Sequence, residues 1–290
     1  MIALLLLMFT IGHYELPHGT TVITLFTQEG IVMASDGLQI TEISTGDPAK
    51  PFRERRDEAE PKVAVCNKYF LCGMSGINPI SLPPPIKVEY HFHKWLPDLS
   101  AKTDLSVEYY AKTVQRKARI TFKNMDVVMK QDNFWKSEIS KSETFLQIAV
   151  AGYDKQVPRY CVIRIKIDRE KRQLIYFPKL DCATPEPHSA TSILTLVLSG
   201  HDQLIARSRT QGTADYDRFR HFVWDAKPKT GTLFPGSPPS VDDAVAWAAA
   251  TVAMQKDADP QTIGGTTRIG VLVKGKLPTV GKPLTLDFGK

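Results

Sequence analysis

The pattern of hydrophobic and polar positions predicts strands at the start of the chain. Residues 20–27, TTVITLFT, alternate in polarity and are rich in β-branched side chains, which is typical of a strand. A second apolar run, residues 31–35, follows a turn that contains Gly30, so the two runs predict a hairpin. The runs KVAVC, from Lys62, and YFLCGM, from Tyr69, predict a second strand pair.

The segments around this second pair differ in character. Residues 37–61 are polar and are interrupted by glycine and proline, so they predict a long loop. Just after Gly76, four prolines exclude a regular helix: Pro79, Pro83, Pro84 and Pro85. From Asp104 to about Lys130, apolar side chains recur at near-helical spacing, which predicts a long amphipathic helix with Asp104 as its cap.

The second half of the chain returns to strands and ends with a helix and a strand. FLQIAVAGYD, YCVIRIKID and QLIYFPK predict three consecutive strands, whereas SILTLVLSG fits a strand or a helix. Residues 241–256 predict a helix capped by Ser240, and residues 267–275 predict a closing strand. This order lacks the regular alternation of a parallel sheet. It predicts an α+β fold with two stacked, largely antiparallel sheets and outer helices.

Composition and charge narrow the class of protein. Of the 290 residues, 42% are hydrophobic and 23% are charged, which is ordinary for a soluble globular protein. The formal net charge of +6 is modest. The densest basic cluster, Arg53, Arg55 and Arg56, is interleaved with acidic residues, so we interpret it as a solvated loop and expect no nucleic-acid partner.

The cysteines give no indication of a metal site. Cys66, Cys72, Cys161 and Cys182 lie in or beside apolar runs, and we expect buried free thiols. The chain has no CxxC pair and no Cys/His spacing typical of zinc. The sequence therefore predicts no metal and no other cofactor.

The N-terminal segment leaves two alternatives open. Residues 2–12, IALLLLMFTIG, are too few to span a bilayer, so we expect no stable membrane insertion. Their length suits a signal peptide and an exported or periplasmic protein, but no Lys or Arg precedes them. The other alternative is a pro-segment of a cytoplasmic protein. In both cases residues 1–19 are removed, and residues 20–290 form a single domain.

The junction HGTT, residues 18–21, is a candidate for nucleophilic chemistry. If the chain is cut before Thr20, this residue gains a free α-amine whose pKa lies near neutrality. That amine can act as the base for the threonine hydroxyl. Gly19 has no Cβ and allows the strained turn that self-cleavage needs. Taken alone, a turn glycine before a strand threonine is common.

Several motifs together resemble the proteasome β-subunit family of N-terminal-nucleophile hydrolases. GTTVITLFTQEGIVMASDG resembles the family's opening, and KVAVCNKYFLCGMSG resembles its second block. AVAGYD and LSGH resemble later strand and turn motifs. The tail, with Gly264-Gly265 before TRIGVLVKG, resembles the family's last glycine pair and closing strand. The resemblance covers about Gly19 to Gly275.

The resemblance implies a fold and a set of site residues. The fold is the four-layer αββα sandwich of N-terminal-nucleophile hydrolases. In the implied site Thr20 attacks the scissile carbonyl, the Lys62 ammonium lowers the pKa of its hydroxyl, and Asp36 pairs with Lys62. The backbone N–H of Gly76 binds the oxyanion, and Ser199 binds the new amine.

The resemblance also suggests less specific roles. Met74 is similar to a residue that lines the specificity pocket, although methionine is also a common core residue. We expect Met74 and Thr21 to contact substrate. Asp257 or Asp259 matches a supporting aspartate of the family, and the spacing does not decide between them.

This chain departs from the family in three places. The segment between Asp36 and Lys62 is about ten residues longer than the family's. Ile263 stands where the family has a serine, which puts the hydrogen bonds around the α-amine in doubt. The prolines after Gly76 interrupt the start of a family helix that packs neighbouring subunits, so ring assembly does not follow from the resemblance.

The implied activity is that of a threonine-type peptidase or amidase. It would cleave itself between Gly19 and Thr20 and then hydrolyse peptide bonds of peptides or unfolded proteins through an acyl-enzyme. A homo-oligomeric ring is one assembly that the family suggests. Two alternatives remain open: a non-catalytic, proteasome-like structural subunit, and a hydrolase of small amides or acyl-amides that uses the same threonine.

Overall fold

The structure of the protein is a computed structural model. The described residues are 15–18, 21–44, 52–57, 59–78, 80–82, 88–102, 105–132, 134–136, 140, 143–185, 194–199, 212, 214, 216–217, 240–258, 260–261 and 263–281.

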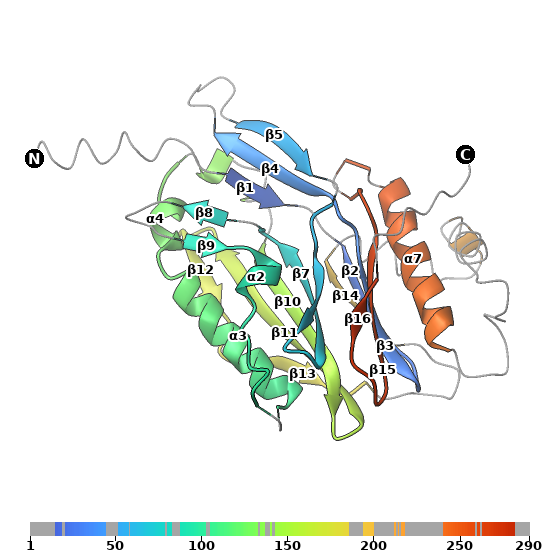
Figure 1. Ribbon diagram of the computed structural model, residues 1–290. Coiled ribbons are helices and arrows are strands. Elements are labelled where there is room, and N and C mark those ends of the chain that lie inside the picture. The colour runs from blue at the N-terminus through green and yellow to red at the C-terminus, as the bar shows by residue number, and fades with distance from the viewer. Residues whose placement is uncertain are drawn as a thin grey trace, which may run out of the picture.

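Two larger antiparallel sheets contain most of the strands (Figure 1). The five-stranded sheet has the order β14 (Leu194–Ser199), β2 (Val22–Phe26), β3 (Gly30–Ser35), β15 (Arg268–Val273) and β16 (Thr279–Val280). The six-stranded sheet has the order β12 (Gln173–Tyr176), β11 (Val157–Asp168), β10 (Thr144–Asp154), β7 (Phe70–Gly76) and β6 (Val63–Cys66), and β13 (Asp181–Ala183) also pairs with β11.

Two smaller sheets lie at one end of the larger ones (Figure 1). One contains β1 (Glu15–His18), β4 (Gln39–Ser44) and β5 (Phe52–Asp57). The prediction of a loop over residues 37–61 was therefore wrong, and the basic cluster lies on a strand. β4 and β5 pair along their whole length, a tertiary contact that the polar composition of the segment conceals. The other small sheet pairs β8 (Ile80–Leu82) with β9 (Val88–Tyr90), which agrees with the predicted absence of a helix just after Gly76.

One hydrophobic cluster joins the facing sides of the two larger sheets. It includes Val22 and Met33 from the five-stranded sheet and Leu71, Ala149 and Val162 from the six-stranded sheet. β2 and β3 are buried at every position, because their second face is also covered. The core therefore extends across both sheets and holds the start of β2 in the interior.

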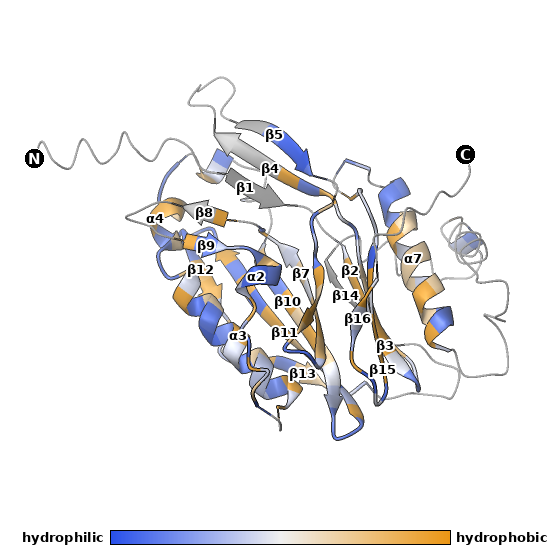
Figure 2. Ribbon diagram, viewed as in Figure 1, coloured by the Kyte–Doolittle hydropathy of each residue, from blue (hydrophilic) through white to orange (hydrophobic). Residues whose placement is uncertain are grey.

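Helices cover the outer faces of these sheets (Figure 1). α7 (Val241–Ala258) packs on the five-stranded sheet, where Ala244, Ala248 and Val252 contact Ile23 and Ala34 in one cluster. Figure 2 shows that α7 is hydrophobic over most of its length. Ser240 caps α7, since its hydroxyl accepts from Asp243 N at 3.1 Å, as the sequence predicts.

The helical segment of the middle region is shorter than predicted. α3 (Val107–Thr121) is capped by Ser106, not Asp104, and a turn separates it from α4 (Met125–Met129). Shorter helical turns among the described residues include α2 (Phe92–Trp95) and η1 (Phe134–Lys136). α3 packs on the six-stranded sheet through the apolar side chains Val107, Tyr110, Ala111, Val114 and Ala118.

Within the described part of the chain, no helix combines the length and the apolar composition that crossing a bilayer requires. The protein thus combines helices with mostly antiparallel sheets, as the sequence predicts.

The cysteines form two disulfides, so the prediction of free thiols was wrong. Cys66 is bonded to Cys72 across the β6–β7 hairpin, and Cys161 is bonded to Cys182 across β11 and β13. The Cα–Cα distance of the first pair is 5.8 Å, within the range that a disulfide spans. Cys161 and Cys182 are direct partners in the strand register, a pairing that spacing along the chain does not reveal.

Candidate active site

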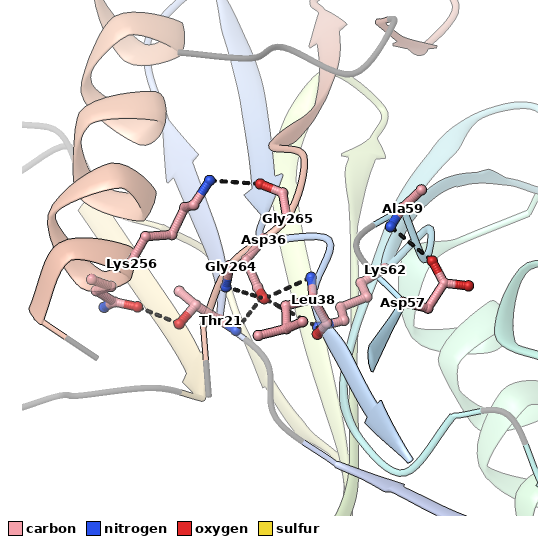
Figure 3. A network of polar contacts seen from close by, with 10 residues as sticks. Thr21, Asp36, Leu38, Asp57, Ala59, Lys62, Lys256, Gly264 and Gly265 are labelled. Atoms are coloured by element: carbon pink, nitrogen blue, oxygen red, sulfur yellow. Dashed lines mark hydrogen bonds and ion pairs between the residues drawn. The ribbon is translucent and has the colours of Figure 1, made fainter. Parts of the chain in front are cut away.

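The predicted nucleophile, Thr20, and Gly19 lie outside the described residues. Thr21, the next residue, directly precedes β2 and is fully buried. The site is therefore built from the residues around Thr21. The dashed contacts in Figure 3 converge on the carboxylate of Asp36, which lies among Thr21, Leu38, Lys62 and Gly264.

Strand pairing brings Asp36 to Thr21. Asp36 directly follows β3, and the antiparallel register of β2 and β3 places Val22 opposite Ser35. The backbone N–H of Thr21 donates to Asp36 Oδ1 at 2.7 Å, and Asp36 N donates to Thr21 O at 3.3 Å. These two bonds extend the pairing of β2 with β3 by one position, and in one of them the Asp36 carboxylate takes the place of a backbone carbonyl.

The Lys62 ammonium lies against the same carboxylate. Lys62 Nζ is 3.3 Å from each oxygen of Asp36 and also donates to the carbonyl oxygen of Leu38. Lys62 immediately precedes β6, and its carbonyl oxygen accepts from Met74 N at 2.9 Å, which fixes its position beside β7. The structure thus brings Asp36 and Lys62 together next to Thr21, as the sequence predicts.

The loop before β15 completes the shell around Asp36. Gly264 N donates to Asp36 Oδ2 at 3.3 Å, and Leu38 N donates to the same oxygen at 3.2 Å. Gly264 O in turn accepts from the backbone N–H groups of Gly37 and Leu38 at 3.0 and 2.9 Å. Gly264, the first residue of the predicted glycine pair, therefore contributes its backbone to the surroundings of Asp36. A side chain at this position would be crowded, because a Cβ on Gly264 would lie 3.2 Å from the side chain of Leu38.

Burial dominates the electrostatics of Lys62. The exposed fraction of its side chain is 2%, and that of Asp36 is 0%. Desolvation lowers the pKa of the Lys62 ammonium from 10.5, while the negative charges of Asp36 and, less strongly, Glu60 act in the opposite direction. The ammonium has a carboxylate and a carbonyl as acceptors, so the charged form is hydrogen-bonded, and a buried cation is tolerated only in such surroundings.

Gly76 is the last residue of β7 and has a φ of +100°. A Cβ at this position would lie 2.4 Å from the backbone oxygen of Phe145, so both the φ angle and the space require glycine. Lys62 pairs with Met74 through the backbone, and Gly76 is two residues further along β7. The predicted oxyanion residue and Lys62 therefore lie toward the same end of their adjacent strands.

The structure describes the other predicted site residues to different extents. Ser199 ends β14 and pairs with Val22, so its backbone lies beside the start of β2, but its side chain is outside the described set. Met74 is fully buried in the cluster beneath α3, as a core residue would be, and its contact with substrate stays a prediction. Asp257 is exposed near the end of α7, and Asp259 lies outside the described residues.

Gln255 is a site residue that the sequence reasoning missed. Its Oε1 accepts a hydrogen bond from the hydroxyl of Thr21, and its side chain is fully buried. Gln255 belongs to the same face of α7 as Ala244, Ala248 and Val252. A single long amide on an otherwise apolar helical face was the signal that could have identified it.

The arrangement suits acid–base and nucleophilic chemistry. It holds an ion pair and a set of backbone N–H donors beside Thr21, the neighbour of Thr20 in the chain. Among the described residues, no three His, Cys, Asp or Glu side chains gather in a way that could hold a metal ion. The hydroxyl of Thr21 is already bound to Gln255, so its predicted contact with substrate also stays a prediction.

Comparison with known proteins gives no family for this chain. A scan against protein-family models finds no match, and a search of the curated proteins finds no match either.

Proposed function

We propose that this protein is an N-terminal threonine hydrolase with the four-layer αββα sandwich of the proteasome β-subunit type. It would cleave itself between Gly19 and Thr20 and then hydrolyse peptide bonds. The observation that carries the proposal is one contact set. The Asp36 carboxylate binds the backbone N–H of Thr21 at 2.7 Å and the Lys62 ammonium at 3.3 Å.

This contact set is more specific than either residue alone. An ion pair that is buried on both sides costs desolvation free energy and gives little net stability compared with apolar packing. Its position, one residue from a Gly-Thr junction, is hard to explain by stability. A function that needs a fixed positive charge beside Thr20 explains it directly.

Self-cleavage would begin at the Thr20 hydroxyl. Its oxygen attacks the carbonyl carbon of Gly19, the C–N bond to Thr20 breaks, and the nitrogen takes a proton to become the α-amine. The resulting ester between Gly19 and the Thr20 oxygen is then hydrolysed by water, which leaves a carboxylate on Gly19. The product is a chain that begins with a threonine whose amine and hydroxyl are both free.

Turnover would repeat this chemistry on a substrate amide. The α-amine takes the hydroxyl proton, the oxygen attacks the scissile carbonyl, and the nearby Lys62 charge stabilises the developing alkoxide. The oxyanion of the tetrahedral intermediate would lie at the Gly76 end of β7, where a backbone donor is typically worth about 3 kcal/mol of transition-state stabilisation. The leaving amine takes the proton, and water hydrolyses the acyl-enzyme.

Intact-mass measurement of the purified protein tests the proposal. The wild type should lose its first 19 residues. Thr20→Ala should stay intact because it lacks the hydroxyl, and Thr20→Ser should still be cleaved because it keeps one. Thr21→Ser is the matched control beside the junction and should process normally. Uncleaved wild-type protein would overturn self-activation and favour a structural subunit, whereas a cut near Gly12 would indicate removal of a signal peptide.

A second measurement addresses the substrate. Processed wild-type protein should hydrolyse fluorogenic peptide amides, and Lys62→Met should abolish this activity. Cleavage of small acyl-amides with no cleavage of peptides would favour the alternative substrate class. Native mass spectrometry would show whether the processed protein forms a homo-oligomeric ring.

A further inference from the structure

A cavity of about 580 Å³ lies on the six-stranded sheet, outside the network around Asp36. Its floor is made by β10 and β11, and its side is made by the segment that joins β12 to β13. The polar and aromatic side chains that matter here are Gln147, Arg164, Lys166, Phe177, Lys179 and Asp181. Three of these side chains are cations and one is an anion, so the cavity is basic.

The cations of this cavity are only partly neutralised. Arg164 donates to Asp181 at 2.6 Å, and Lys166 is 3.8 Å from Glu143, whose side chain is 83% exposed. Lys179 is exposed and has no ion pair or hydrogen bond with another described residue. An anion that entered the cavity would meet Lys166 and Lys179 without displacing the bond between Arg164 and Asp181.

The cavity lies on the face of the six-stranded sheet that turns toward the five-stranded sheet. Side chains alternate along strands, so Arg164 shares a face with Val162, which belongs to the cluster between the two larger sheets. Gln147 is opposite Arg164 on one side and opposite Ser75 on the other. Gly73, two residues before Ser75, faces Val22 and Met33 of the opposite sheet.

This cross-strand row gives a distance from the cavity to Gly76. Ser75 directly precedes Gly76, and neighbouring strands are about 4.8 Å apart, so Arg164 is about 10 Å from Ser75 across β10. An extended peptide advances about 3.3 Å per residue. A peptide whose scissile carbonyl lies at Gly76 therefore reaches the cavity with a side chain about three residues from the cut.

We propose that this cavity is a binding subsite for an acidic side chain of a peptide substrate, about three residues from the scissile bond. The inference rests on the proposed hydrolase function, because the position of the cut defines the distance. Lys179, which has no ion pair or hydrogen bond with a described residue, and Lys166 both line the cavity and bind the carboxylate. The Phe177 ring, which lies 5.9 Å from Lys166 Nζ, covers the aliphatic part of the side chain.

Peptide binding and cleavage test this subsite separately. Two labelled peptides that differ only in Glu or Gln at one position are titrated against the full protein by fluorescence anisotropy. The varied position is the third residue before the cut in one experiment and the third residue after the cut in a second. The Glu peptide should bind about fivefold more tightly on one side of the cut, and 0.5 M NaCl should reduce the preference. In Lys166→Gln/Lys179→Gln the preference should disappear, whereas in the control Lys276→Gln it should remain.

The outcomes distinguish this proposal from the proposed function. A Glu preference that depends on Lys166 and Lys179, in a protein that cleaves neither peptide, supports the subsite and overturns the hydrolase. Cleavage of both peptides with equal kcat/KM and equal affinity overturns the subsite and leaves the hydrolase. Displacement of the Glu peptide by an equal concentration of inorganic phosphate would show a general anion site and would also overturn the proposal.

Discussion

Asp36 and Lys62 form an ion pair in which the ammonium nitrogen is 3.3 Å from both carboxylate oxygens and neither side chain reaches solvent. The pair connects two sheets, since Asp36 follows β3 of the five-stranded sheet and Lys62 precedes β6 of the six-stranded sheet. It therefore fixes the position of one sheet against the other at the start of β2.

Asp36→Asn should strongly destabilise the protein. Removing one partner leaves an uncompensated buried charge, and the expected loss is about 3–5 kcal/mol in the free energy of unfolding. Lys62→Met should cost a similar amount for the opposite charge. Because the double variant Asp36→Asn/Lys62→Met leaves no buried charge, it should be more stable than either single variant. Urea denaturation of the four proteins measures the coupling, and additive losses would contradict a buried ion pair.

The pH dependence of Lys62 should affect stability and activity in opposite directions. Burial lowers the pKa of its ammonium below 10.5 in the folded protein, despite the charge of Asp36. Between that lowered pKa and 10.5 the unfolded chain binds more protons, so this residue makes the free energy of unfolding rise with pH. Over the same range kcat/KM should fall, because the charged ammonium is lost.

The measurement is a pH profile of kcat/KM and of urea unfolding on the same protein. Asp36→Asn should move the fall in kcat/KM to lower pH, since it removes the charge that holds the pKa up. A rise in kcat/KM across this range would mean that neutral Lys62 acts as a base, and the proposed role of its charge would be wrong.

Gln255 should act as a positioning residue through Thr21. Gln255→Met keeps the length of the side chain but leaves the buried hydroxyl of Thr21 without an acceptor, which should cost about 1–3 kcal/mol of stability. Thr21→Val removes the partner, so the double variant should recover part of that loss. The rate of Gly19–Thr20 cleavage, followed by intact mass, should fall in Gln255→Met and partly recover in Gln255→Glu, which keeps an acceptor. An unchanged cleavage rate would limit Gln255 to a packing role.

The sequence predicted the parts of this site that local patterns and spacing define. The strand pairs β2–β3 and β6–β7 followed from alternation and turn residues, and they bring Asp36 and Lys62 together beside Thr21, whereas their position relative to Thr20 stays a prediction. What the sequence did not predict depends on contacts between distant segments. Gln255 meets Thr21 across 234 residues, and Gly264 meets Asp36 across 228, so no local pattern indicates which residue each of them contacts.

The same reason explains the errors about β4, β5 and the cysteines. The segment between Asp36 and Lys62 is polar in sequence, and its strands pair with each other and with β1. Cys161 and Cys182 are brought together by the register of β11 and β13. Pairing of this kind becomes visible only when the strands are placed in a sheet.

Gly76→Ala should impair both folding and catalysis, and Gly275→Ala provides a matched control. Both glycines have positive φ angles, +100° and +78°, but only Gly76 would place its Cβ 2.4 Å from a backbone oxygen. The positive φ alone costs about 1 kcal/mol for alanine, so this is the loss expected at Gly275. Thermal denaturation should show a clearly larger loss at Gly76, and peptide hydrolysis should fall only in that variant. Equal losses at the two positions would remove the argument that space requires glycine at Gly76.

Reduction of the disulfides should destabilise the protein to different degrees. The Cys66–Cys72 bond closes a loop with a sequence separation of 6, and the Cys161–Cys182 bond closes one of 21. In the chain-entropy model these loops correspond to about 2 and about 3 kcal/mol, so Cys161→Ala/Cys182→Ala should lower the stability more than Cys66→Ala/Cys72→Ala.

Protein denatured without reductant should take up no thiol-alkylating reagent, as judged by intact mass. Uptake of the reagent at Cys66 and Cys72 would show that these two cysteines are free thiols. They lie on β6, which directly follows Lys62, and on β7, which ends at Gly76. Because stable disulfides are typical of oxidising compartments, complete protection would favour an exported protein over a cytoplasmic one.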